Sequence, residues 1–196
     1  MDKKENRRKI RAVLAGGLVL GVGAVITLAA WNSSESAAGT FGTGAFELRG
    51  SLDGADFANH PEAAPAGLSF SMNPTTLGPG DTVSAPFAVQ LTEATTYDAT
   101  VTINTEFGAN LDGLGYRVFS TAAFDCTSAE TGTIVPSTTL ASGEGVGTFD
   151  LAKSATAGQP GATINLCFEV TAGTQAELSA GESSTALWEF AAAQKN

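Results

Sequence analysis

The sequence predicts an all-β domain, an antiparallel β-sandwich or barrel, that follows an N-terminal signal helix. Two observations lead to this expectation. A cationic stretch followed by an apolar run opens the chain, which is the order found in targeting segments. Beyond residue 30, short runs of alternating apolar and polar residues recur between turn residues, without the longer apolar spacing of amphipathic helices.

The first thirty residues have the pattern of an export signal. Six basic residues lie within residues 1–11, and the run that follows is uncharged and apolar. We expect a hydrophobic helix over residues 12–30, with signal-peptidase cleavage between Ala30 and Trp31. A second small-residue site ends at Ala38, and the apolar run is also long enough for a retained membrane anchor.

Removal of the signal leaves a strongly acidic chain. Of the 10 basic and 20 acidic residues in the sequence, four basic and eighteen acidic residues follow Ala30, which gives a net charge of −14. Such a charge repels nucleic acid and anionic lipid headgroups. We therefore expect no nucleic-acid partner, and membrane contact only through an uncleaved signal. The remaining chain is long enough to bury the core of a single domain, which we place at residues 51–196.

Candidate strands alternate with turns rich in Gly and Pro along the rest of the chain. The first is at residues 41–49, and a second at residues 67–72 follows a connection rich in Pro and Ala. The turn at residues 78–81 leads into a third at residues 82–91, where Pro86 indicates a sheet edge or a bulge. Shorter candidates occupy residues 115–120, 131–135 and 146–151.

Three further candidates show which face of the strand meets the core, because side chains alternate between the two faces. In residues 95–104 the core face carries Tyr97, Ala99, Val101 and Ile103. In residues 162–171 the apolar residues occupy even positions, which places Cys167 on the outer face. In residues 184–192, we interpret Trp188 as a core residue instead of a binding platform.

The two cysteines of the chain, Cys126 and Cys167, are expected to form a disulfide in an oxidising compartment. In the chain-entropy model, closing a loop of this length contributes about 3–4 kcal/mol. Such a bond would pin a loop or a neighbouring strand to the exterior of the sheet. Two unpaired thiols are the alternative. A metal site is disfavoured, because two cysteines and one histidine fall short of the usual four ligands.

Several short motifs surround the expected cleavage site. Thr-Leu-Ala-Ala at residues 27–30 precedes an aromatic residue, and Gly-Thr-Phe-Gly-Thr-Gly at residues 39–44 leads into Phe-Glu-Leu at residues 46–48. A Leu-Gly-Pro-Gly-Asp turn occupies residues 77–81, and Phe-Glu-Val-Thr occupies residues 168–171. With these motifs the chain resembles the TasA/camelysin family of Gram-positive bacteria, whose precursors are cleaved by SipW-type signal peptidases.

The resemblance implies a secreted jelly-roll β-sandwich that polymerises into extracellular fibres of the biofilm matrix or cell surface. Donor-strand exchange is the mode of assembly in this family. The donor would be residues 31–50, with Phe41, Phe46 and Leu48 as its apolar contacts, and the partner would be a second copy or a related fibre subunit. A secreted β-sandwich that binds carbohydrate or protein without polymerising is the alternative.

Catalytic chemistry is not expected, although camelysin-type members have been catalogued as metallopeptidases. His60 is the only histidine, so neither a HExxH zinc site nor a Ser-His-Asp triad can form. Asp53 and Asp56 form the densest pair of carboxylates, and we interpret them as a solvated loop because they lack the spacing of an EF-hand. The sequence predicts no enzyme, no metal and no cofactor.

Overall fold

The computed structural model describes residues 44–108, 113–140, 146–178, 181, 183 and 185–195. Residues 43–196 form one compact unit, whose strands are β1 (Leu48–Ser51), β2 (Thr82–Leu91), β3 (Ala99–Phe107), β4 (Leu114–Thr121), β5 (Glu130–Thr139), β6 (Gly147–Leu151), β7 (Ile164–Ala172) and β8 (Ala186–Gln194). No helix in the described part is long and apolar enough to cross a membrane. The predicted signal helix at residues 12–30 and its cleavage site, Ala30 and Trp31, lie outside the described residues.

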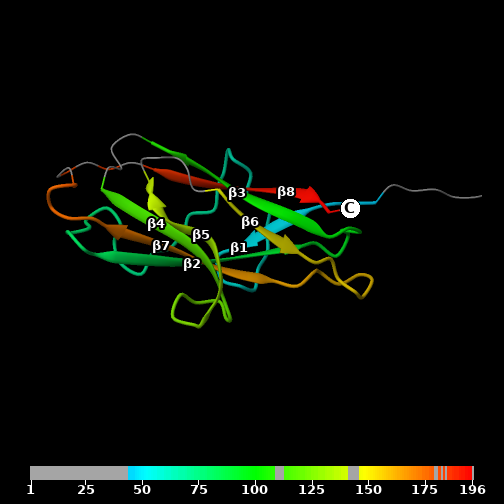
Figure 1. Ribbon diagram of the computed structural model, residues 1–196. Helices are drawn as coiled ribbons and strands as arrows, with labels where there is room; N and C mark the ends of the chain where they lie inside the picture. The colour runs from blue at the N-terminus through cyan, green and yellow to red at the C-terminus, as the bar shows by residue number, and fades with distance from the viewer. Residues whose placement is uncertain are drawn as a thin grey trace, which may run out of the picture. The chain divides into compact units, whose positions relative to one another are not determined.

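The eight strands form two antiparallel sheets. One sheet has five strands in the order β1-β2-β7-β4-β5, and the other has three in the order β6-β3-β8. Every strand pair within these sheets is antiparallel. The two sheets pack face to face (Figure 1), so the predicted all-β sandwich is confirmed.

The strand order is that of a jelly roll in which the place beside β8 is unpaired. In an eight-stranded jelly roll, strands 2, 7, 4 and 5 form one sheet, and strands 6, 3, 8 and 1 form the other. The same order is present here in β2-β7-β4-β5 and in β6-β3-β8, but β1 pairs with β2 instead of β8. No strand of the described part therefore pairs with the second side of β8.

The core lies between the two sheets and follows the alternation of the strands. The odd positions of β2 from Val83 to Leu91 are buried on its inner face. Val101 and Ile103 of β3 face them from the other sheet and are fully buried. The even positions of β7 face the core as predicted, with Phe168 in contact with the aromatic residues of β8.

Five predicted strands agree with the structure to within two residues at each end. They are the candidates at residues 82–91, 115–120, 146–151, 162–171 and 184–192. The predicted strand at 131–135 is extended to Thr139 in β5. Pro86 lies at a partly open edge, as expected, because β1 pairs only with residues 88–91 of β2. Proline has no backbone N–H, so at this unpaired position it removes no hydrogen bond between strands.

The predicted strand at residues 95–104 begins four residues later, at Ala99. Residues before it bond to the N-terminal part of the domain: the Thr96 N–H donates to the Ala45 carbonyl at 3.1 Å, and the Thr92 N–H donates to the Glu47 carbonyl at 3.0 Å. The prediction that Tyr97 shares the core face of β3 is therefore wrong: Tyr97 precedes the strand and is 43% exposed.

The predicted strand at residues 67–72 is wrong. Residues 67–70 belong to an irregular segment over residues 59–70, which we call the flap, and Ser71 follows it. Leu68 and Phe70 pack against the core, which explains their alternation. The backbone meets β2 only at Ser71, whose N–H donates to the Ser84 carbonyl at 2.8 Å. The predicted strand at 41–49 likewise reduces to β1, with residues 41–43 outside the described part.

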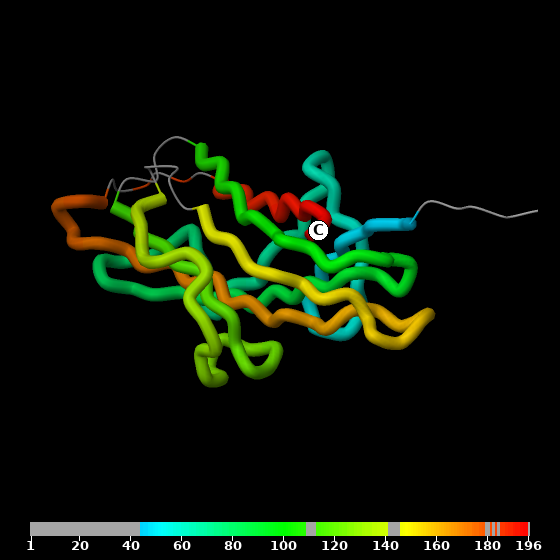
Figure 2. Tube along the Cα trace, turned by 45° about the vertical axis from the view of Figure 1, so that its right-hand side comes forward, coloured from blue at the N-terminus to red at the C-terminus, as the bar shows by residue number. Residues whose placement is uncertain are grey.

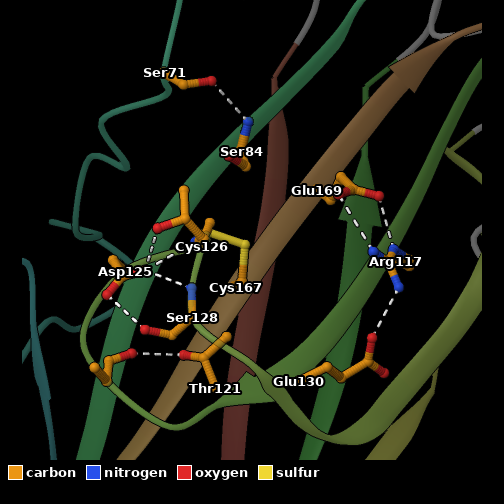
Figure 3. The surroundings of a disulfide bond; sticks show 12 residues. Ser71, Ser84, Arg117, Thr121, Asp125, Cys126, Ser128, Glu130, Cys167 and Glu169 are labelled. Carbon is orange, nitrogen blue, oxygen red and sulfur yellow. Dashed lines mark hydrogen bonds and ion pairs between the residues drawn. A yellow bond between two sulfur atoms is a disulfide. The ribbon is translucent and has the colours of Figure 1, made fainter.

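The disulfide between Cys126 and Cys167 is formed, with a Cα–Cα distance of 5.3 Å. Cys126 lies in the loop between β4 and β5, and Cys167 lies on the outer face of β7 (Figure 3). The bond therefore holds a loop against the exterior of the five-stranded sheet, as predicted. The loop covers Cys167 completely, because this side chain is 0% exposed although it is outside the core.

Asp125 stabilises the same loop by accepting hydrogen bonds from its neighbours. The side chains and backbone N–H groups of Ser128 and Thr127 donate to its carboxylate at 2.6–2.8 Å. These hydrogen bonds, first those from the side chains, lower the pKa of Asp125 from 3.8 to about 2. Beside the loop, the Arg117 guanidinium bonds Glu169 and Glu130 and lies 4.3 Å from the ring centre of Phe119 (Figure 3).

Replacing both cysteines by serine is expected to lower the free energy of unfolding by about 3–4 kcal/mol, because the unfolded chain regains the entropy of an open loop. Urea unfolding followed by circular dichroism measures the change. The Thr127→Ser variant leaves the cross-link intact and serves as the control, with a change within about 0.5 kcal/mol. A double-serine variant as stable as the parent would contradict the assigned role of the disulfide.

Asp125 should make stability sensitive to acid. Its folded pKa lies below its unfolded value, so its contribution is present above about pH 4 and is lost as the pH falls toward 2. We expect Asp125→Asn to be less stable than the parent at pH 5, and the difference to shrink at pH 2.5. Urea titrations at both pH values test this, and a difference independent of pH would count against it.

Candidate functional site: an open groove beside β8

The unpaired side of β8 borders a groove of about 590 Å³. The groove lies between β8 and the flap, at the side of the sandwich where the three-stranded sheet ends. Figure 2 shows the flap, in teal, beside the red strand β8. The site is therefore built from the edge of one sheet, the inner face of the other and an irregular segment that crosses between them.

The groove is lined mainly by apolar side chains from four strands and from the flap. β1 and β2 supply Gly50 and Phe87, and β7 supplies Phe168. Phe190 of β8 lies over Phe87, with ring centres 5.4 Å apart, and the ring centres of Trp188 and Phe168 are 4.9 Å apart. The flap contributes Pro61, Pro65, Ala66, Leu68 and Phe70.

The backbone groups that face the groove follow from the hydrogen-bond pattern of β8. The Gly108 N–H donates to the Thr185 carbonyl at 3.0 Å, so odd-numbered residues of β8 bond to β3. In an antiparallel ladder the alternate residues point their N–H and C=O groups the other way. Ala186, Trp188 and Phe190 therefore present donors and acceptors to the groove, in the form that an added strand requires.

Two side-chain atoms at the groove are buried without a hydrogen-bond partner in the described part of the chain. They are Nε1 of Trp188 and Nδ1 of His60. The indole N–H is a donor, and a buried donor without a hydrogen bond costs about 1–3 kcal/mol. His60 contacts Phe87 edge to face, with ring centres 6.4 Å apart. A ligand with main-chain carbonyl and amide groups would satisfy such atoms.

Carboxylates surround the groove. Glu62 comes from the flap, Glu106 from β3 and Glu189 from β8. The Glu189 carboxylate accepts a hydrogen bond from the Asn104 amide at 3.1 Å, which holds it on the outer face of the three-stranded sheet. The rim is thus acidic and the interior apolar, so the groove suits an uncharged chain segment better than an anionic one.

The structure separates the residues predicted for the donor strand. Leu48 lies in β1 and pairs with Leu91 of the same domain. Phe46 precedes β1 and is 37% exposed, and Phe41 lies outside the described residues. The part of the predicted segment that precedes the described domain is residues 31–43. The donor role itself stays a prediction.

Trp188, Tyr97 and Tyr116 do not form a common exposed face for stacking sugars. Tyr116 is 2% exposed, and Trp188 packs partly buried against the core, in agreement with its interpretation as a core residue. Tyr97 alone of these three is exposed. Its position at the end of the sandwich, before β3, separates it from the groove.

The carboxylate pair at Asp53 and Asp56 is a loop, as predicted. Asp53 accepts hydrogen bonds from the backbone N–H groups of Asp56 at 2.8 Å and Ala55 at 2.9 Å, and these lower its pKa. The carboxylate is thereby occupied by its own turn. Among the residues that the structure describes, no group of three or more His, Cys, Asp or Glu is placed to hold a metal ion.

Comparisons with protein-family models and with curated proteins give no match to this chain. The fold and the site therefore define it by class: an antiparallel β-sandwich with one unpaired strand edge that opens into an apolar groove. The groove was not predicted from the sequence. The one available signal was the stretch from His60 to Phe70, where two prolines interrupt an apolar segment.

Gly50 lies at the floor of the groove, where a methyl group would collide with Phe87. A Cβ atom at position 50 would lie 2.4 Å from Cζ of that ring, which is itself held between His60 and Phe190. We expect Gly50→Ala to lower the free energy of unfolding by about 1–3 kcal/mol through overpacking. Chemical denaturation measures this. Gly67→Ala is the matched control, because nothing lies within 4 Å of its Cβ position, and an equal loss in both variants would contradict the assignment.

Proposed function

We propose that this protein is an exported structural subunit that assembles with itself into extracellular fibres, through a strand donated to the groove beside β8. The observation that carries the proposal is the unpaired edge of β8 over an apolar groove in a fold whose jelly-roll order has a strand at that place. The resemblance to the TasA/camelysin family supports the same role.

The proposed donor is residues 31–43 of a neighbouring copy. Thirteen extended residues span about 43 Å, and the nine residues of β8 span about 30 Å, so the donor is long enough for the whole edge. Its sequence suits the groove, because it carries Ala37, Gly39 and Phe41 at alternate positions and a single charged residue, Glu35. β1 would stay in its own sheet, paired with β2.

Export and processing by a SipW-type peptidase would precede assembly. Cleavage after Ala30 removes the apolar run and the six basic residues, and so frees the donor at its N-terminal end. A disulfide suits a protein that folds outside the cytoplasm. Each subunit gives one strand and receives one, so the contact is head-to-tail and extends into a filament.

Removing one backbone donor from the free edge of β8 should stop assembly without unfolding the domain. The N–H of Ala186 points into the groove, and this residue is the first of the strand, where proline is tolerated. We expect the processed chain, starting at Trp31, to form filaments that sediment and are visible by electron microscopy at acidic pH, where repulsion between acidic subunits is weaker. Ala186→Pro should remain monomeric.

Ala186→Ser keeps the N–H group and is the matched control, which should assemble like the parent. A free peptide of residues 31–43 should block growth by occupying the groove. A parent chain that stays monomeric over a range of pH would overturn the proposal. Binding of the peptide by a monomeric parent would instead favour a module that accepts an extended segment of another protein.

A further inference from the structure

The first residues that the structure describes are held at a fixed place on the domain. Residues 44–47 are held to the turn at residues 92–97, because the Glu47 N–H donates to the Thr95 hydroxyl at 3.1 Å and Ala45 forms a β-bridge with Thr95. Thr95 is only 8% exposed. This clamp lies beyond the end of β8 that pairs with Ala99, whereas the groove lies along the other half of the strand.

Three side chains around this clamp are exposed and free to meet a neighbour. Phe46 and Tyr97 are 37% and 43% exposed, and they are among the few large apolar side chains on the described surface. Lys153 reaches the same turn, where its ammonium group donates to the Thr96 carbonyl at 2.9 Å. We call Phe46, Tyr97 and Lys153 the clamp face.

Lys153 differs from the other basic side chains of the described domain. Arg49, Arg117 and Lys195 each form an ion pair with a carboxylate of the same chain. Lys153 forms no ion pair with any residue that the structure describes. In a domain with a large excess of carboxylates, an exposed ammonium group without one is available for a carboxylate of a partner.

We propose that the clamp face binds the flap of the neighbouring copy that holds the donated strand. This inference rests on the proposed function and adds a second contact to it. The flap presents Pro61 and Pro65 on either side of Glu62, all of them exposed at the rim of the groove. Proline packs on aromatic rings, as in the recognition of proline-rich segments. Glu62 would supply the carboxylate partner that Lys153 does not have within its own chain's described residues.

The length of the donor brings these two surfaces together. When residues 33–41 pair antiparallel to the nine residues of β8, Phe41 lies at the groove end of the strand, and the two residues that remain before the clamp span roughly 7 Å. The clamp that ends the donor must then lie close to the rim of the occupied groove, where the flap is. The second contact therefore forms at high effective concentration and needs little affinity of its own.

A charge exchange between Lys153 and Glu62 tests the inference. The critical concentration for filament formation, measured by sedimentation of the processed chain, should rise about 3- to 10-fold in Lys153→Glu and in Glu62→Lys, because each places like charges opposite one another. The double variant should return to within about twofold of the parent. Lys195→Glu is the control for net charge, since that residue pairs with Asp150 of its own chain.

The free peptide of residues 31–43 separates this inference from the proposed function. It should inhibit assembly of Lys153→Glu and of the parent with equal potency, because the groove is unchanged. The second contact would be overturned if neither single reversal changed the critical concentration, or if the double variant did not return to the critical concentration of the parent. Either result would leave the proposal of a donated strand unaffected. A parent that never assembles would overturn both.

Discussion

The unequal size of the two sheets is the constraint on which the rest of the structure depends. Five strands face three, so part of the inner face of β1 and β2 has no strand opposite it. Phe87 and Val89 line the groove beside this part and must be kept from water. The flap covers them with apolar side chains but does not pair with β8, which leaves a strand edge and an apolar surface open at one place.

The flap also shows where reading a sequence for strands succeeds and fails. β2 was predicted with its observed bounds, because its apolar residues alternate along a strand that lies within a sheet and buries one face. Residues 67–72 alternate in the same way and are not a strand. Alternation reports that one side of an extended chain is buried, and not that its backbone is paired. Pairing depends on contacts distant in sequence, such as those between Ala45 and Thr95 that shorten β3.

The disulfide could be placed from sequence because the alternation of β7 fixes the face of Cys167. The contacts of its loop could not, since they join separate parts of the chain. Phe124 of that loop lies against Gly54, where φ is +76° and a Cβ atom would come within 2.6 Å of the ring. Gly54 lies three residues after the end of β1. The cross-linked loop thus supports the turn after β1, at the strand that forms one wall of the groove.

The acidic surface acts differently on approach and on contact. Subunits of like charge repel one another over a range set by the Debye length, about 8 Å at physiological ionic strength. A strand seated in the groove is held by backbone hydrogen bonds and apolar burial, which act at contact distance and are little affected by salt. In the proposed assembly, charge would therefore slow the encounter of two copies, and the groove would determine how long a seated donor keeps them joined.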